Sequence, residues 1–178
     1  MRGDREGTTM TPLLLDLVNS RIVYPDGPHD ELADDAAARA WLRERGVEGT
    51  REEIADARTV RPVLAAVIRG EEPADALAPW VDVMHRRARL TRDGLRWQDD
   101  VPAGRRVGVR AIEEWAALQG PDGSRIRPCA DPDCQHFLVD HSRANARKWH
   151  SMEICGNRAK ARRHYARSKE KGGAGSAQ

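Results

Sequence analysis

The residues of this chain that could do chemistry are three cysteines and one histidine in its last third. Cys129 and Cys134 are separated by four residues, and His150 and Cys155 are separated by the same number. Zn²⁺ takes four thiolate or imidazole ligands at the corners of a tetrahedron, and a structural site fills all four positions with protein atoms. Two ligand pairs of equal spacing therefore predict one structural Zn²⁺ in a Cys₃His site.

Two other histidines compete for the fourth ligand position. His136 is so close to Cys134 in sequence that it would not span the tetrahedron easily, and His141 lies in the middle of the insert between the two pairs. Three cysteines cannot all pair as disulfides, which favours the cytoplasm as the location. Because the segment holds few apolar residues, we expect zinc binding and folding to be one event.

Basic residues are concentrated in the same part of the chain. The whole chain of 178 residues has a net charge of +2, but residues 124–171 hold 12 Lys and Arg against 5 Asp and Glu. All four lysines fall in this segment: Lys148, Lys160, Lys169 and Lys171. This asymmetry predicts a basic module that binds a polyanion, carried by an acidic globular domain.

The residues after Cys155 predict a basic helix. Asn157 is a good N-cap, and the alanines after it favour a helix through about Lys169. We expect Gly156 to adopt a positive φ, and residues 137–140 and 146–149 to form a hairpin, which together give a small treble-clef-like zinc finger. A helix fits the major groove of DNA, where Arg pairs with guanine and Lys contacts phosphate. The predicted nucleic-acid contacts are Arg143, Arg147, Lys148, Arg158, Lys160, Arg162, Arg163, Arg167 and Lys169.

Residues 11–120 predict a mainly helical domain with one short β-hairpin. Asp30 is expected to cap a first helix that ends near residue 45. Thr50 and Glu53 form a capping box for a second helix, whose apolar face recurs every three or four residues until Gly70. Further helices are expected over 77–84 and 112–118, and a hairpin over 90–97 around an Asp-Gly turn. The apolar run over 13–18 is too short to classify by its period.

Several classes of protein are excluded at this level. No apolar run approaches the roughly 18 residues that a membrane span needs, so we expect no membrane association. No phosphate-binding glycine loop, nucleophile elbow or His-Glu-x-x-His helix occurs, so no catalytic residues are expected. The first ten residues and the tail over 171–178 are polar or small, and we expect both to be flexible.

The C-terminal segment resembles the CGNR zinc finger, which is named for the four residues that stand here at 155–158. The resemblance extends to Phe137, Asp140, Trp149 and the basic run over 160–163. The family usually has Cys where this chain has His150, which changes a Cys₄ site into Cys₃His. Both sets of ligands bind zinc.

Residues near the start of the chain resemble the ABATE domain that usually precedes this finger, in the stretches over 15–19 and 41–42. The resemblance implies an ABATE-like domain over 11–120 and a CGNR-type finger over 124–170. It also implies a bacterial stress-induced transcription regulator.

These observations together predict a zinc-containing transcription regulator that binds double-stranded DNA and associates with the nucleoid when bound. The first domain is a candidate for sensing a small-molecule effector or for forming a homodimer. The alternative is a zinc-stapled adaptor that binds protein or RNA. An enzyme is the least favoured class, because four protein ligands leave the metal no open position for water.

Overall fold

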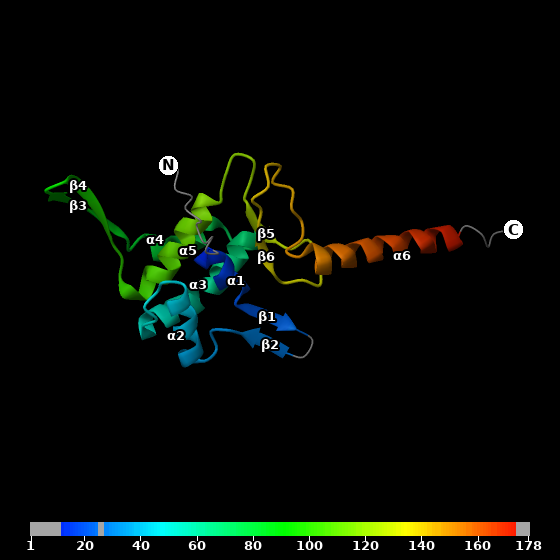
Figure 1. The fold of residues 1–178 in the computed structure, drawn as a ribbon, viewed down its shortest axis with the longest axis horizontal. Coiled ribbons are helices and arrows are strands. Elements are labelled where there is room, and N and C mark those ends of the chain that lie inside the picture. Colours follow the sequence, from blue (N-terminus) through cyan, green and yellow to red (C-terminus); the bar gives the residue numbers. More distant parts are fainter. Residues whose placement is uncertain (1–11, 25–26, 174–178) are drawn as a thin grey trace, which may run out of the picture.

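The computed structural model describes residues 12–24 and 27–173. About half of the chain is helical, and three small antiparallel sheets of two strands each accompany the helices. Figure 1 shows a central group of helices with a long β-hairpin at one end and a long helix at the other. The predicted flexible segment over 1–10 lies outside the described residues, as do residues 174–178 of the predicted tail.

Helix α3 (Arg51–Arg69) is the axis of the central group. Its N-terminus is the predicted capping box, with Thr50 and Glu53 each accepting a hydrogen bond from the backbone amide of the other. The helix ends at Gly70, which has a φ of 74° that favours glycine. Its apolar face includes Ile54, Val60 and Leu64, which are buried in the core. The sequence prediction for this helix is confirmed at both ends.

Three other helices complete the core around α3. The apolar run that its period could not classify is helix α1 (Leu13–Asn19), which packs against α3 and against α5 (Arg106–Ala117). Helix α2 (Asp35–Glu44) covers a further part of α3. The predicted helix over 77–84 is instead a 3₁₀ turn (η1, Ala74–Leu77) followed by the short helix α4 (Ala78–Val81). A second 3₁₀ turn (η2, Ala103–Arg105) precedes α5.

The expected helix start at Asp30 is wrong. Residues Arg21–Tyr24 (β1) and Gly27–Asp30 (β2) form an antiparallel pair, so Asp30 ends a strand. Its carboxylate receives two hydrogen bonds of 2.7 Å from the buried Arg61. Helix α2 begins after Asp34, whose side chain caps the backbone amides of residues 36 and 37. Asp30 and Asp34 are both suitable N-cap residues, and local capping rules do not distinguish between them.

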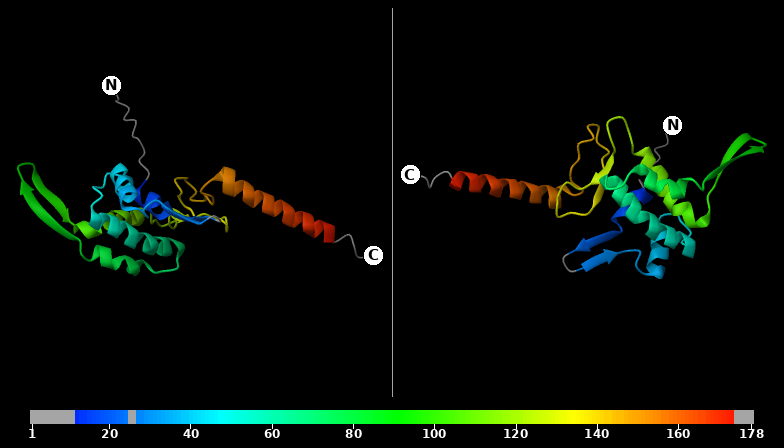
Figure 2. Two further views of the ribbon diagram at one scale, coloured as in Figure 1. Left: turned by 90° about the horizontal axis from the view of Figure 1, so that it is seen from below. Right: turned by 180° about the vertical axis from the view of Figure 1, so that it is seen from behind.

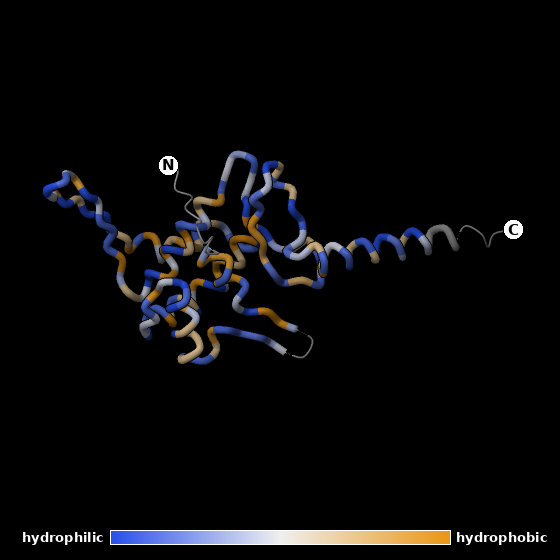
Figure 3. Tube along the Cα trace, viewed as in Figure 1, coloured by the Kyte–Doolittle hydropathy of each residue, from blue (hydrophilic) through white to orange (hydrophobic). Residues whose placement is uncertain are grey.

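The second hairpin of the first domain lies where the sequence predicts one but is longer. Strands β3 (His85–Thr91) and β4 (Gly94–Asp100) pair along their whole length, with Thr91 opposite Gly94. The views in Figure 2 show this hairpin standing away from the helices, and most of its side chains are exposed. Figure 3 shows that the hairpin is largely hydrophilic, with a few apolar positions near its tip.

The C-terminal segment packs on the same core as the helices. Strands β5 (Ile126–Pro128) and β6 (Phe137–Val139) form the third sheet, and Phe137 is buried among residues of α1 and α3. The side chain of Asn19 both donates to and accepts from the backbone of Phe137, at 3.1 and 2.8 Å. Helix α6 (Asn157–Gly173) then leads away from the body, so the chain remains helical past residue 171.

Candidate metal centre

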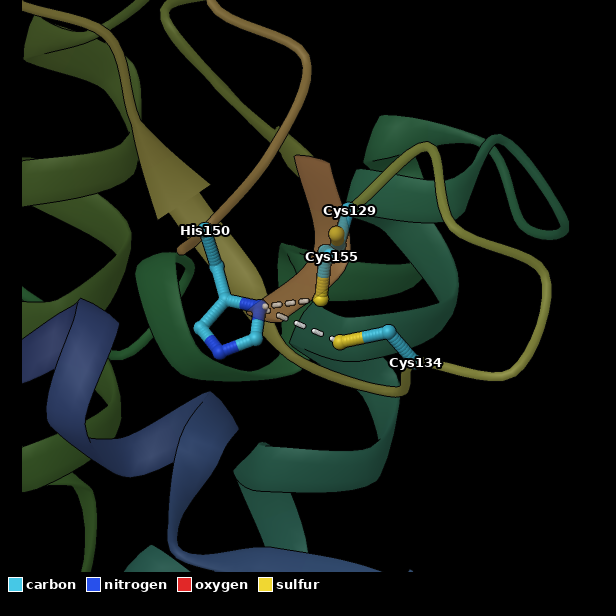
Figure 4. A group of neighbouring side chains, drawn as sticks. All are labelled: Cys129, Cys134, His150 and Cys155. Atoms are coloured by element: carbon cyan, nitrogen blue, oxygen red, sulfur yellow. Dashed lines mark hydrogen bonds between the residues drawn. The ribbon is translucent and has the colours of Figure 1, made fainter. Parts of the chain in front are cut away.

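The four predicted zinc ligands meet at one point. Cys129 and Cys134 belong to the loop that joins β5 to β6, and a hydrogen bond of 2.8 Å from the Cys129 amide to the His136 carbonyl closes this loop. His150 and Cys155 come from the segment before α6 (Figure 4). One ligand atom from each of the four residues lies within 4.8 Å of the others. Sequence spacing alone therefore identified a set of side chains that the fold brings together.

The separations fit a tetrahedral zinc ion. Nδ1 of His150 lies 3.2 Å from Sγ of Cys134 and 3.3 Å from Sγ of Cys155. Ordinary Zn–S and Zn–N bond lengths place a sulfur and a nitrogen ligand about 3.5 Å apart. Burial lowers the pKa of His150, and the charge of Arg147 lowers it further. The imidazole is therefore neutral at neutral pH and offers a lone pair, so these residues hold one structural Zn²⁺.

The thiols are arranged to bind a cation. When no metal compensates the charge, burial and the neighbouring thiols of Cys129 and Cys134 together raise the pKa of Cys155 to about 12, and burial is the larger cause. Burial also raises the pKa of Cys134. A divalent ion removes this penalty because it supplies the positive charge that each thiolate lacks.

The last ligand lies in a π-helical turn (η3, Met152–Gly156) that leads into α6. The hydroxyl of Ser151 accepts a hydrogen bond from the amide of Ile154, so Ser151 caps the turn. The prediction of Asn157 as N-cap is wrong, because its φ and ψ are helical. Gly156 is not among the glycines with positive φ, and an added Cβ would lie 2.5 Å from Sδ of Met152. The backbone at Gly156 is therefore ordinary, and the atoms nearest an added Cβ belong to the exposed side chain of Met152.

The two rival histidines lie outside the ligand set. The ring of His136 stacks on that of His150, with centroids 4.3 Å apart and planes 7° from parallel. His141 is exposed. His136 therefore buttresses the fourth ligand from one side.

The part of the insert that follows strand β6 is held by one buried acid and not by a second strand. Asp140 accepts hydrogen bonds from the amides of Ser142 and Arg147, at 2.8 and 2.6 Å. Bonding to Ser142 lowers the pKa of Asp140 to about 2, and the Arg147 amide contributes to this shift. The predicted hairpin between 137–140 and 146–149 is wrong, since β6 pairs with β5 instead. The guanidinium of Arg147 donates to the carbonyl of His150 at 2.6 Å and so positions the ligand.

An ion-pair cluster fixes the start of α6 on the zinc loop. Arg162 donates to both Asp131 and Asp133, and the Asp133 contact is 2.6 Å. Nε of Arg158 lies 3.4 Å from the second oxygen of Asp131. Asp131 is fully buried, and burial opposes its ionisation, but the hydrogen bond from Arg162 lowers its pKa overall. Two arginines predicted to contact nucleic acid thus have acidic partners within the protein.

The remaining predicted contacts whose side chains the structure describes are solvent-exposed. Lys160, Arg163 and Arg167 lie on one side of α6, and none of them has a carboxylate partner among the side chains described through residue 168. Lys148 and Arg163 line a hollow of about 530 Å³ beside the helix. Arg143 is exposed in the insert. The side chain of Lys169 lies outside the described part of the chain.

Sequence reasoning missed the acids of this region. Asp131, Asp133 and Asp140 organise the zinc loop, the helix base and the insert, yet the sequence assigned none of them a structural role. Asp131 and Asp133 fall between two zinc ligands, and Arg158 and Arg162 lie one helical turn apart. Two acids in the first ligand segment and two arginines one helical turn apart after the last ligand are the signal that could have revealed the cluster.

The fold and the site define a helical domain whose core continues into a zinc finger. Residues 125–168 match the family model of the CGNR zinc finger. Residues 11–121 match the model of ABATE, described as "Putative stress-induced transcription regulator". Because that match covers more than half of the chain, the protein belongs to the ABATE family. The first description names a zinc finger and the second a transcription regulator, and neither names a catalytic activity.

Two further findings complete the comparison. No curated protein matches the chain. Within the residues that the structure describes, no helix has both the length and the apolar character needed to cross a membrane.

Proposed function

We propose that this protein is a DNA-binding transcription regulator in which a structural zinc ion fixes the base of a basic reading helix. The observation that carries the proposal is the face of α6 formed by Lys160, Arg163 and Arg167. These side chains are exposed, while the opposite edge of the helix is paired with the zinc loop. Within the described residues this positive face has no carboxylate partner, so it is available for phosphate oxygens.

The surroundings of the helix support the same partner. Lys148 from the insert and Arg163 from α6 line the same hollow, together with Trp149 and Pro132. Two cations that line one hollow can contact the phosphates of one strand while the helix lies in the groove. The first domain contributes the scaffold and, in this proposal, a sensing or oligomerisation role.

The test is a salt titration of binding to a random DNA duplex, measured by fluorescence anisotropy. Four phosphate contacts, from Lys148, Lys160, Arg163 and Arg167, give a slope of log K against log salt of about −3.5. Arg163→Gln should make this slope less steep by about 1 without changing zinc content.

Arg92→Gln, at the tip of the β3–β4 hairpin, removes the same charge far from α6 and should leave the slope unchanged. A slope near zero for the wild-type protein would overturn the proposal. Competition by single-stranded RNA that exceeds competition by duplex DNA would favour the RNA-binding adaptor instead.

A further inference from the structure

A second concentration of positive charge lies away from α6, in a hollow of about 320 Å³. One side of α3 contributes Arg58, Arg61 and Arg69, and Arg21 at the start of β1 faces them. Gln135, which directly follows the zinc ligand Cys134, closes the hollow from the zinc loop. The volume is at the lower end of the range for small-molecule sites, which is roughly 300–1,000 Å³.

Two of the four arginines are neutralised within the protein. Arg61 is 8% exposed and forms a two-bond pair with Asp30. Arg58 lies 2.8 Å from Asp35 and also donates to the carbonyl of Leu32. These two residues are fixed in place, and they line the hollow with rigid guanidinium groups.

The other two arginines leave an excess of positive charge. Arg21 lies 3.8 Å from Asp30, which already serves Arg61, and its side chain is 54% exposed. Arg69 has no carboxylate partner within the described residues, and its guanidinium lies 4.8 Å from the centre of the Phe137 ring. No acidic residue lines the hollow.

The amide of Gln135 adds a neutral donor. Its oxygen accepts a hydrogen bond of 3.1 Å from the backbone amide of Val23, which leaves the NH₂ group for another partner. The hollow therefore offers N–H donors from Arg21, Arg69 and Gln135 and has no acidic acceptor of its own.

From this donor set we infer a binding site for a small dianion that carries two or more anionic oxygens, of the phosphate or dicarboxylate class. Arg21 and Arg69 contact the ligand, because a guanidinium pairs with such oxygens through two parallel hydrogen bonds. Arg58 and Arg61 form fixed walls of the site, and Asp35 and Asp30 balance their charges. The site bridges the first domain and the zinc loop, and it does not depend on the proposed binding of DNA.

The experiment is isothermal titration calorimetry of the zinc-loaded, full-length protein, without DNA. Inorganic phosphate and malonate are titrated separately, with sodium chloride of equal ionic strength as the blank. We expect at least one of them to bind with 1:1 stoichiometry. Arg69→Gln should weaken that binding about tenfold or more, as loss of a charge-assisted hydrogen bond implies.

Three further variants make the result specific. Arg21→Gln should also weaken binding, which guards against a particular effect of the first substitution. Arg163→Gln on α6 and Arg92→Gln on the hairpin remove the same charge elsewhere and should leave the dissociation constant unchanged. The inference is overturned if neither probe binds above the chloride blank. It is also overturned if Arg163→Gln abolishes binding while Arg69→Gln does not.

Discussion

Replacing Asp131 by Asn tests whether the zinc loop holds the base of α6 through a buried charge. The carboxylate is fully buried, and the side chains of its partners Arg158 and Arg162 are 41% and 40% exposed. Asn keeps the volume but removes the charge. The substitution weakens charge-assisted hydrogen bonds, but the exposed arginines can bind water instead, which limits the cost. We therefore expect the free energy of unfolding to fall by about 2 kcal/mol, within the range for hydrogen bonds to charged groups. For a protein of this size that lowers the Tm by about 4–8 °C.

Asp133 provides a matched control for this prediction. It contacts the same two arginines, but its side chain is 62% exposed. An exposed ion pair contributes about 0–1 kcal/mol, so Asp133→Asn should change the Tm by only a few degrees at most.

The assay is thermal unfolding followed by circular dichroism, with zinc content measured on each sample. A double-mutant cycle with Arg162→Gln should give a coupling of about 1 kcal/mol for Asp131. Equal losses for Asp131→Asn and Asp133→Asn, with zinc retained, would refute the reasoning.

Three further predictions concern the metal centre. Cys134→Ser should abolish stoichiometric zinc in elemental analysis and unfold the zinc loop; a folded, zinc-free variant would contradict the structural role of the metal. Zinc affinity should rise with pH between about 6 and 8, because at least two protons leave Cys134 and Cys155 when the ion binds. Competition with a chromogenic chelator measures the affinity at each pH. A slope of log K against pH below 1 would be inconsistent with this prediction. Gly156→Ala should lower the free energy of unfolding by less than about 1 kcal/mol in denaturant titrations, because the atoms that the new Cβ meets belong to the exposed side chain of Met152, which can move aside; a loss of several kcal/mol would contradict this.

The features that the sequence predicts well are those fixed by local chemistry. The capping box at Thr50, the stop at Gly70 and the four zinc ligands each depend on a few residues at set spacing. A helix cap or a metal tetrahedron accepts few alternatives, so its residues can be recognised without the rest of the fold.

The features that were missed depend on distant partners. Asp30 ends a strand because its carboxylate accepts hydrogen bonds from Arg61, which lies far along the chain. Residues 146–149 form no strand because β5 already pairs with β6 and Asp140 binds the amide of Arg147. In each case a contact with a residue distant in the sequence determines the local structure, and local propensity carries no information about that contact.

The two hydrogen bonds between Asn19 and the backbone of Phe137 join helix α1 of the helical body directly to strand β6 of the finger. Helix α6 has 17 residues and therefore measures about 25 Å. A rod of that length, clamped at its root, turns a tilt of about 10° into a movement of roughly 4 Å at its far end. That distance is comparable with the spacing between neighbouring base pairs, so the angle at which the finger sits on α1 decides where the far end of α6 lies.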